Sequence, residues 1–106
     1  MKNNNEINKR GAYKSDGKKM MIKIKRNEKK KIEVIKMLEQ QNPLLISKVN
    51  SIFRGAFYQR DSVYRDLQED NVIKINWDNN KISFSDGVSI KGRDKLGNLM
   101  VETKDE

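Results

Sequence analysis

Two short segments of the sequence gather side chains that form forked hydrogen bonds or donate to anions. The first segment contains Tyr58, Gln59, Arg60, Ser62, Tyr64 and Arg65, and the second contains Asn79, Asn80 and Lys81. Arg pairs bidentately with guanine, and Gln or Asn with adenine, while Tyr, Ser and Lys donate to phosphate oxygens. Both segments are therefore candidate contacts to a nucleic acid.

A third candidate segment, made of cations, lies near the amino terminus. Residues 1–31 hold twelve basic residues against three acidic ones, and residues 32–106 hold eleven against twelve, so the first third carries the entire net charge of +8. The candidate contacts there are Lys9, Arg10, Lys14, Lys18 and Lys19. We expect residues 1–19 to form a flexible basic arm, because they include few large apolar residues. Such an arm favours binding to a nucleic acid, because each cation that meets a phosphate releases counterions. A solubilising terminus, or an arm that binds an acidic membrane or protein surface, is the alternative.

The composition argues against most catalytic chemistry. The chain has no Cys and no His, which removes disulfides, thiolate nucleophiles, His-based triads and zinc fingers. Asp66, Glu69 and Asp70 could hold Mg²⁺, but carboxylates at this spacing are more often a solvated helix face. We expect no enzymatic activity, no cofactor and no metal. No apolar run reaches the roughly 18 residues of a membrane span, and the first residues are polar, so we expect a cytoplasmic protein without a membrane partner.

The chain length and the hydrophobic pattern predict one α+β domain with helices followed by strands. Helices are expected over residues 27–41 with Asn27 as cap, 43–54 with Pro43 in the first turn, and 61–70 with Asp61 or Ser62 as cap; strands are expected over residues 20–25, 72–77, 81–85, 88–91 and 99–103. Asp86 and Gly87 are a hairpin signal between the third and fourth of these strands.

The pattern leaves some assignments open. Residues 20–25 alternate apolar and basic side chains, as a strand does, but they could also lead into the first helix. Residues 20–25 and 99–103 could pair with each other or with a second copy of the chain. Trp77 and Phe84 alternate in phase with isoleucines and are expected in the core, which argues against an RNA-binding sheet that stacks bases on aromatic rings. Phe57 and Tyr58 are the rings that we expect to be exposed.

This order of elements resembles the winged helix-turn-helix family over residues 32–84. The similarity lies in three helices followed by a hairpin, and in Leu67, four polar residues, then Val72 and Ile73 at the exit into that hairpin. The resemblance implies that the third helix enters the major groove of double-stranded DNA and that the hairpin, the wing, touches the backbone or the minor groove. The first segment would then lie on or before the recognition helix, the second would form the wing tip, and residues 20–104 would form the domain.

Two features depart from that family. The turn before the third helix is longer than usual, and the acidic residues Asp61, Asp66, Glu69 and Asp70 oppose DNA unless they face away. Arg60 and Arg65 could instead form local ion pairs with Asp61 and Glu69. The arm and the wing would then contribute more of the contact than the recognition helix.

The size, basic arm, composition and element order also resemble the small relaxosome accessory proteins of conjugative plasmids, of the TcpK type. This resemblance implies binding to repeats at an origin of transfer, beside a relaxase or another DNA-processing protein. A transcriptional regulator, or a protein-binding adaptor or inhibitor of a plasmid or phage, is the alternative. The expected partners are double-stranded DNA and a second copy of the chain, since many winged-helix dimers read two half-sites.

Overall fold

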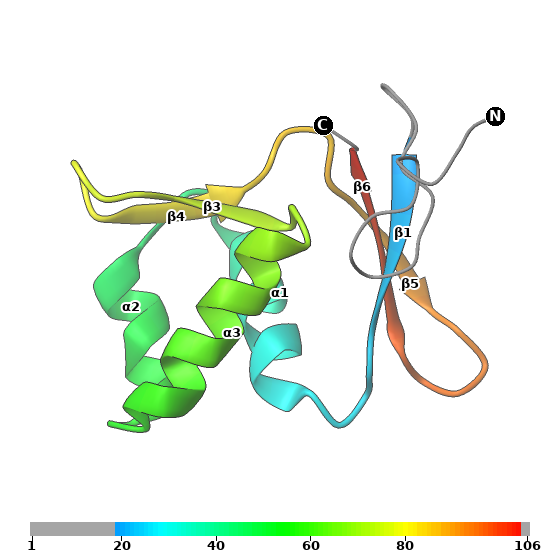
Figure 1. Cartoon of the computed structure of the whole chain (residues 1–106), viewed down its shortest axis with the longest axis horizontal. Coiled ribbons are helices and arrows are strands. Elements are labelled where there is room, and N and C mark those ends of the chain that lie inside the picture. The colour runs from blue at the N-terminus through cyan, green and yellow to red at the C-terminus, as the bar shows by residue number, and fades with distance from the viewer. Residues whose placement is uncertain (1–18, 105–106) are drawn as a thin grey trace, which may run out of the picture.

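The computed structural model describes residues 19–104, which form an α+β domain of three α-helices and two antiparallel sheets (Figure 1). The elements follow in the order β1 (Lys19–Ile24), α1 (Lys29–Gln40), β2 (Leu44–Leu45), α2 (Ile46–Asn50), a 3₁₀ turn η2 (Ser51–Phe53), α3 (Phe57–Glu69), β3 (Ile73–Asn76), β4 (Lys81–Phe84), β5 (Ser89–Arg93) and β6 (Leu99–Lys104). The predicted α+β class is confirmed, and the predicted helices and strands follow in the predicted order, but strand β2 between α1 and α2 was not predicted. Of the proposed arm contacts, Lys9, Arg10, Lys14 and Lys18 lie outside the described residues, and Lys19 is the first residue of β1.

The first helix forms where its apolar spacing predicts. Ile32, Ile35 and Leu38 recur at helical intervals and are buried, and α1 packs against α3. The predicted cap Asn27 is wrong, because the residue before the helix is Glu28. One carboxylate oxygen of Glu28 accepts the backbone N–H of Lys25 at 2.9 Å, so this side chain ties the entry loop to the helix.

The second helix begins later than Pro43 predicts. The Asn42-Pro43 peptide bond is cis, and the next two residues form β2, which pairs with β4. Leu44 is buried opposite Ile82, and the N–H of Ile46, the first residue of α2, donates to the carbonyl of Asn80 at 2.8 Å. Pro43 at the first helical position would favour a helix over the residues that follow it. Instead, pairing with β4 and the burial of Leu44 keep residues 44–45 in a strand.

The third helix begins earlier than predicted. The turn after η2 is made by Arg54 and Gly55, whose φ angles are 53° and 87°, and helix α3 follows after a single residue, Ala56. The predicted caps Asp61 and Ser62 are therefore wrong, since both lie inside α3. The connection from η2 to α3 is only residues 54–56, so the long turn that separated the sequence from the winged-helix pattern is absent from the structure.

The six strands divide into two sheets of three. The first has the order β2-β4-β3, with Ile75 opposite Ile82, and the second has the order β1-β6-β5, with Ile22 opposite Val101. Residues 20–24 are thus a strand and pair with the last strand of the same chain. Asp86 and Gly87 do not form a hairpin, because β4 and β5 lie in different sheets and these residues turn the chain from one sheet to the other.

One hydrophobic core connects both sheets to the helices. The buried cluster includes Leu38 of α1, Leu67 of α3, Ile82 of β4 and Val101 of β6. Phe84 packs against it, as predicted, but Trp77 does not, since 65% of its surface is exposed. The prediction that Trp77 is a core residue is wrong, because β3 ends at Asn76 and Trp77 lies in the turn beyond it.

Candidate nucleic-acid interface

Helix α3 turns one stripe of side chains outward. Tyr58, Asp61, Ser62, Arg65 and Glu69 recur three or four positions apart, and none of them is buried. The opposite side, Val63, Tyr64 and Leu67, lies in the core. The predicted exposure of Phe57 and Tyr58 is confirmed, with exposed fractions of 61% and 95%.

Tyr64 is a predicted DNA contact that the structure contradicts. Its ring is buried edge-on against Phe53, with 5.9 Å between the ring centroids, and its hydroxyl donates to Oδ1 of Asn50 at 2.6 Å. Burial raises the pKa of Tyr64 to about 12; Asp61 adds to this rise and Arg60 opposes it. Tyr64 therefore joins α3 to the end of α2 and does not face a ligand.

The two arginines of α3 have different surroundings. The guanidinium of Arg60 lies 4.9 Å from the centroid of the Phe57 ring and forms an ion pair with Asp61 at 3.1 Å, so the predicted pairing with Asp61 is confirmed. Arg65 is more exposed; its Nη2 lies 3.4 Å from Oγ of Ser62, and its Nε lies 3.7 Å from Asp66. Arg65 is thus the better placed of the two to leave α3 for an external acceptor.

The carboxylates of α3 do not all face outward. Nζ of Lys31, in α1, lies 3.1 Å from Asp66 and 2.6 Å from Glu28. Burial alone would lower the pKa of Lys31, but its hydrogen bonds to these two carboxylates raise it above the usual value. Likewise, burial would raise the pKa of Glu28, but the hydrogen bonds from Lys31 and Lys25 lower it. One negative charge of α3 is therefore compensated by α1.

Replacing Lys31 with Met is expected to lower the free energy of unfolding by about 1–2 kcal/mol at pH 7, because it leaves Glu28 and Asp66 without this partner. Since the pKa of folded Glu28 is lowered, its contribution is present above its ordinary value of 4.5 and is lost as the pH falls through the folded value. The raised pKa of Lys31 adds stability that is complete below 10.5 and is lost as the pH rises through the folded value. Urea titrations at pH 7 and pH 3 measure the difference.

The control is Lys29→Met, because Lys29 forms no ion pair within residues 19–104. This variant should retain the stability of the parent chain at both pH values. An equal loss in the two variants, or a loss from Lys31→Met that is as large at pH 3 as at pH 7, would contradict the role given to Lys31.

The β3–β4 hairpin, which we call the wing, presents a polar face to solvent. The register places Lys74 opposite Ser83 and Asn76 opposite Lys81, while Ile73, Ile75 and Ile82 take the other face. At the tip, Oδ1 of Asn76 accepts the N–H of Asp78 at 3.0 Å, and Asn80 has a φ angle of 56°. Asn79, Asn80 and Lys81 are exposed, as residues that contact a ligand must be.

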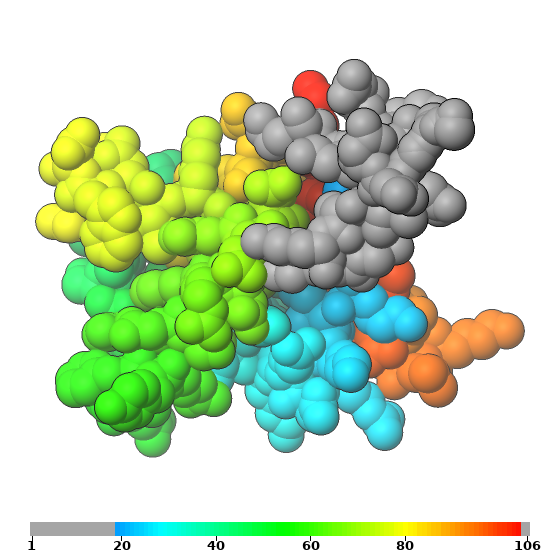
Figure 2. Space-filling model, viewed as in Figure 1, coloured from blue at the N-terminus to red at the C-terminus, as the bar shows by residue number. Residues whose placement is uncertain are grey.

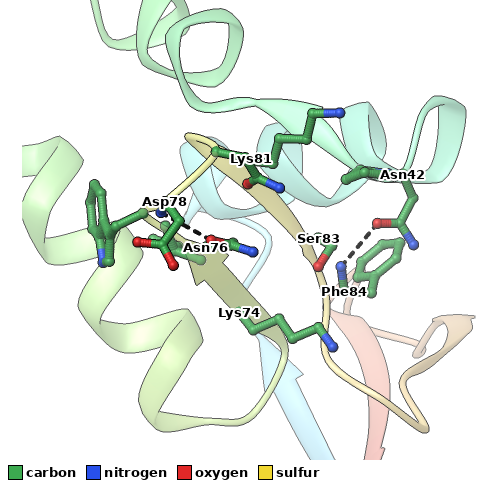
Figure 3. Close-up of a pocket in the computed structure, with 11 residues that line it drawn as sticks. Asn42, Lys74, Asn76, Asp78, Lys81, Ser83 and Phe84 are labelled. Carbon is green, nitrogen blue, oxygen red and sulfur yellow. Dashed lines mark hydrogen bonds between the residues drawn. The ribbon is translucent and has the colours of Figure 1, made fainter.

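An open groove of about 760 Å³ runs along this polar face (Figure 3). The wing strands form most of its lining, and Asn42 and Pro43 of the α1–β2 loop complete it. Oδ1 of Asn42 accepts the N–H of Phe84 at 3.2 Å, which attaches the loop to the wing. Two lysines, three asparagine amides and the exposed indole of Trp77 thus offer donors and a stacking surface to a polyanion, against one carboxylate, that of Asp78.

Sequence reasoning missed Lys74, Asn76, Ser83 and the exposure of Trp77. The signal for the first three was the alternation that located the isoleucines, because every second residue of a half-buried strand faces away from the core. Trp77 belonged to the same alternation, and only the end of β3 at Asn76 distinguishes it.

The remaining α3 candidates lie beside the start of α1. Gln59 and Ser62 line a hollow of about 220 Å³ together with Lys29 and Lys30. Figure 2 shows α3 and the wing exposed on the same face of the molecule. The structure therefore brings Tyr58, Gln59, Ser62 and Arg65 together on α3, and Asn79, Asn80 and Lys81 together on the wing, whereas Arg60 is directed to Phe57 and Tyr64 is buried.

Comparisons of this chain with protein-family models, curated proteins and solved structures found no match. Among residues 19–104, no three acidic side chains are grouped closely enough to hold a metal ion. None of the helices described here has both the length and the apolar composition needed to cross a membrane.

Proposed function

We propose that this chain is a winged helix-turn-helix protein that binds double-stranded DNA and catalyses no reaction on it. The observation that carries the proposal is the pairing of β2, which lies between α1 and α2, with β4 of the wing. The short turn of residues 54–56 between η2 and α3 gives further support. A recognition helix and a wing attached to one core are the two contact elements that such proteins use.

In this proposal the two elements have different tasks. The start of α3 enters the major groove, where Gln59 and Arg65 contact base edges and Tyr58 and Ser62 donate to phosphates. The wing lies along the backbone or the minor groove, where Lys74 and Lys81 meet phosphates. The outward carboxylates Asp61 and Glu69 reduce the attraction of α3 for DNA, so the wing supplies much of the affinity.

The test is a fluorescence-anisotropy titration of the full chain with two labelled duplexes, one from the origin of transfer and one from the region upstream of its gene. Scrambled duplexes are the controls, and all are measured at two salt concentrations. We expect one of the two duplexes, the specific duplex, to bind more tightly than its scrambled control at both salt concentrations. Weak binding that ignores sequence and disappears with salt would contradict the proposal, because it would reflect basic charge alone.

Replacing Arg65 with Ala should reduce the discrimination between the specific duplex and its scrambled control by about 1–3 kcal/mol, the usual value of a good contact to a base. Arg60→Ala removes the same charge from the same helix, but Arg60 is held by Phe57 and Asp61, so its effect should be smaller. An equal loss of affinity for specific and scrambled DNA would show that Arg65 does not contact the bases. Circular dichroism of both variants checks that the fold is retained.

The biological process that we favour is plasmid transfer. Binding to repeats at an origin of transfer would place the chain beside a relaxase, whereas a transcriptional regulator would bind upstream of its own gene. Competition between duplexes from these two regions separates the two roles. Tighter binding to the origin duplex supports transfer, and tighter binding to the upstream duplex supports regulation.

A protein-binding adaptor is the second candidate function. Two observations favour it: Phe57 and Tyr58 are adjacent exposed rings, and the outward stripe of α3 has one cation, Arg65, against two carboxylates. Aromatic residues are enriched in protein interfaces. Replacing both rings with Ala would then abolish partner binding and leave any DNA affinity unchanged, which is the opposite of the result expected from a recognition helix.

A further inference from the structure

A second, cationic cavity is lined by residues of the β1–α1 loop, α1 and the end of β5 and shares no lining residue with the groove of the wing. Its volume is about 300 Å³, and it is lined by Arg26, Lys29, Ile32, Glu33, Lys36 and Arg93. Four of these six side chains are cations and one is an anion. Three separate elements thus converge to place an excess of positive charge around one hollow.

Local ion pairs do not explain these four cations. Within residues 19–104, none of them lies at ion-pair distance from a carboxylate, whereas Lys30, Lys31, Lys74 and Lys91 each do. Glu33, the acidic residue of the lining, lies 3.5 Å from Nζ of Lys30. All four cations are exposed to solvent, which weakens the repulsion among them, and an anion bound between them would reduce that repulsion further.

Two of the three walls of the cavity, the β1–α1 loop and the end of β5, are attached to the same loop. Nη1 of Arg93 donates to the carbonyl of Gly97 at 2.7 Å, and the N–H of Arg26 donates to Oδ1 of Asn98 at 3.1 Å. Both acceptors belong to the β5–β6 loop, and Asn98 is buried. These bonds hold one guanidinium and the backbone that carries the other before any ligand arrives, which is the kind of preorganisation that binding sites use.

We propose that this cavity binds a phosphate group, and that the phosphate belongs to the backbone of duplex DNA beside the base pairs contacted by the start of α3. Guanidinium groups bind phosphate through two parallel N–H bonds, and the amino-terminal turn of α1 adds its positive dipole. Lys29 lines both this cavity and the hollow that holds Gln59 and Ser62. The identity of the ligand as DNA rests on the proposed function, whereas phosphate binding by the cavity does not.

The first experiment tests the cavity without DNA. Inorganic phosphate is added to the ¹⁵N-labelled full chain, and amide chemical shifts are followed by NMR. The amides of Lys29, Ile32 and Arg93 should shift with saturation, and these shifts should weaken in Lys36→Gln but remain in Lys104→Gln, an exposed charge outside the cavity. Shifts that do not saturate, or that are equal in the two variants, would overturn the site.

The second experiment tests DNA as the source of the phosphate. For Lys36→Gln, a plot of log affinity against log salt should become shallower by about 0.9 for the phosphate contact that is lost. The loss should be equal on specific and scrambled duplexes, and Lys104→Gln should retain the parent slope. Equal slopes in both variants would overturn DNA as the ligand. If the parent chain binds no duplex while phosphate still shifts the cavity amides, the proposed function fails and the phosphate site stands.

Discussion

A chain that lacks residues 1–18 is expected to bind specific and scrambled duplexes more weakly by the same factor, and its dependence on salt should be less steep. These residues contain five basic and two acidic side chains. Each phosphate contact that is lost reduces the salt slope by about 0.9, so the loss of all five cations would reduce it by about 4–5. Deletion up to residue 18, and not 19, keeps Lys19 in β1, where it is paired with Lys104. Anisotropy titrations over a range of salt concentrations measure both quantities.

The matched control for this deletion is the full-length chain with the five cations changed to Gln. It removes the charge and keeps the length, so it should reproduce the effect of the deletion. A loss of affinity confined to the specific duplex would contradict the role of a general phosphate contact. Retained affinity in the charge variant, together with loss in the deletion, would show that charge is not the cause.

Replacing Ile82 with Ala is expected to lower the free energy of unfolding by about 2–5 kcal/mol, the range observed when a buried Ile loses three carbons. Ile82 is fully buried in β4, the central strand of its sheet, opposite Leu44 and Ile75. A domain of this size has a total stability of about 5–15 kcal/mol, so the variant should be much closer to unfolding. Urea titration followed by circular dichroism measures the change.

Ile82→Val is the graded control, because it removes one methylene group and should cost about 0.5–1.5 kcal/mol. Ile75→Val should lower the free energy of unfolding by less than Ile82→Val does, because Ile75 is only half-buried on the neighbouring strand. If Ile82→Ala were no more destabilising than Ile82→Val, the claim that Ile82 is a central core residue would be contradicted.

The parts of the fold that the sequence predicted correctly are those with a strong hydrophobic period. The spacing of Ile32, Ile35 and Leu38 predicted the first helix, and alternation predicted strands β1, β3, β4 and β6. Residues 20–24 and 99–104 pair with each other, which the sequence had left open against pairing with a second copy. A hydrophobic period depends on many residues, so one competing contact rarely changes the helix or strand that it predicts.

The errors occur where one residue was used to place a boundary. Pro43 is favourable at the start of a helix, but burial of Leu44 against the wing extends the chain there. Asp61 and Ser62 are good caps, but the positive φ angles of Arg54 and Gly55 start α3 earlier. Asp86 and Gly87 are favourable in a hairpin turn, but here the turn joins two sheets. Each of these outcomes depends on contacts between distant residues, which local preferences do not encode.

The candidate site was predicted in part for a related reason. Residue type proposed Gln59, Arg65 and the wing tip as contacts, and these residues are exposed, but residue type alone could not separate Tyr64, which faces the core, from Tyr58, which faces solvent. The polar face of the wing and the cavity around Arg93 bring together residues that are far apart in the sequence. Their convergence required the register of the strands.

The pairing of β1 with β6 also brings the two ends of the described domain together. Lys19 and Lys104 are direct partners at one end of that ladder, so the polypeptide on either side of the described domain is tethered at the same edge. A probe or a fused domain attached at one end of the described domain would therefore lie beside its other end.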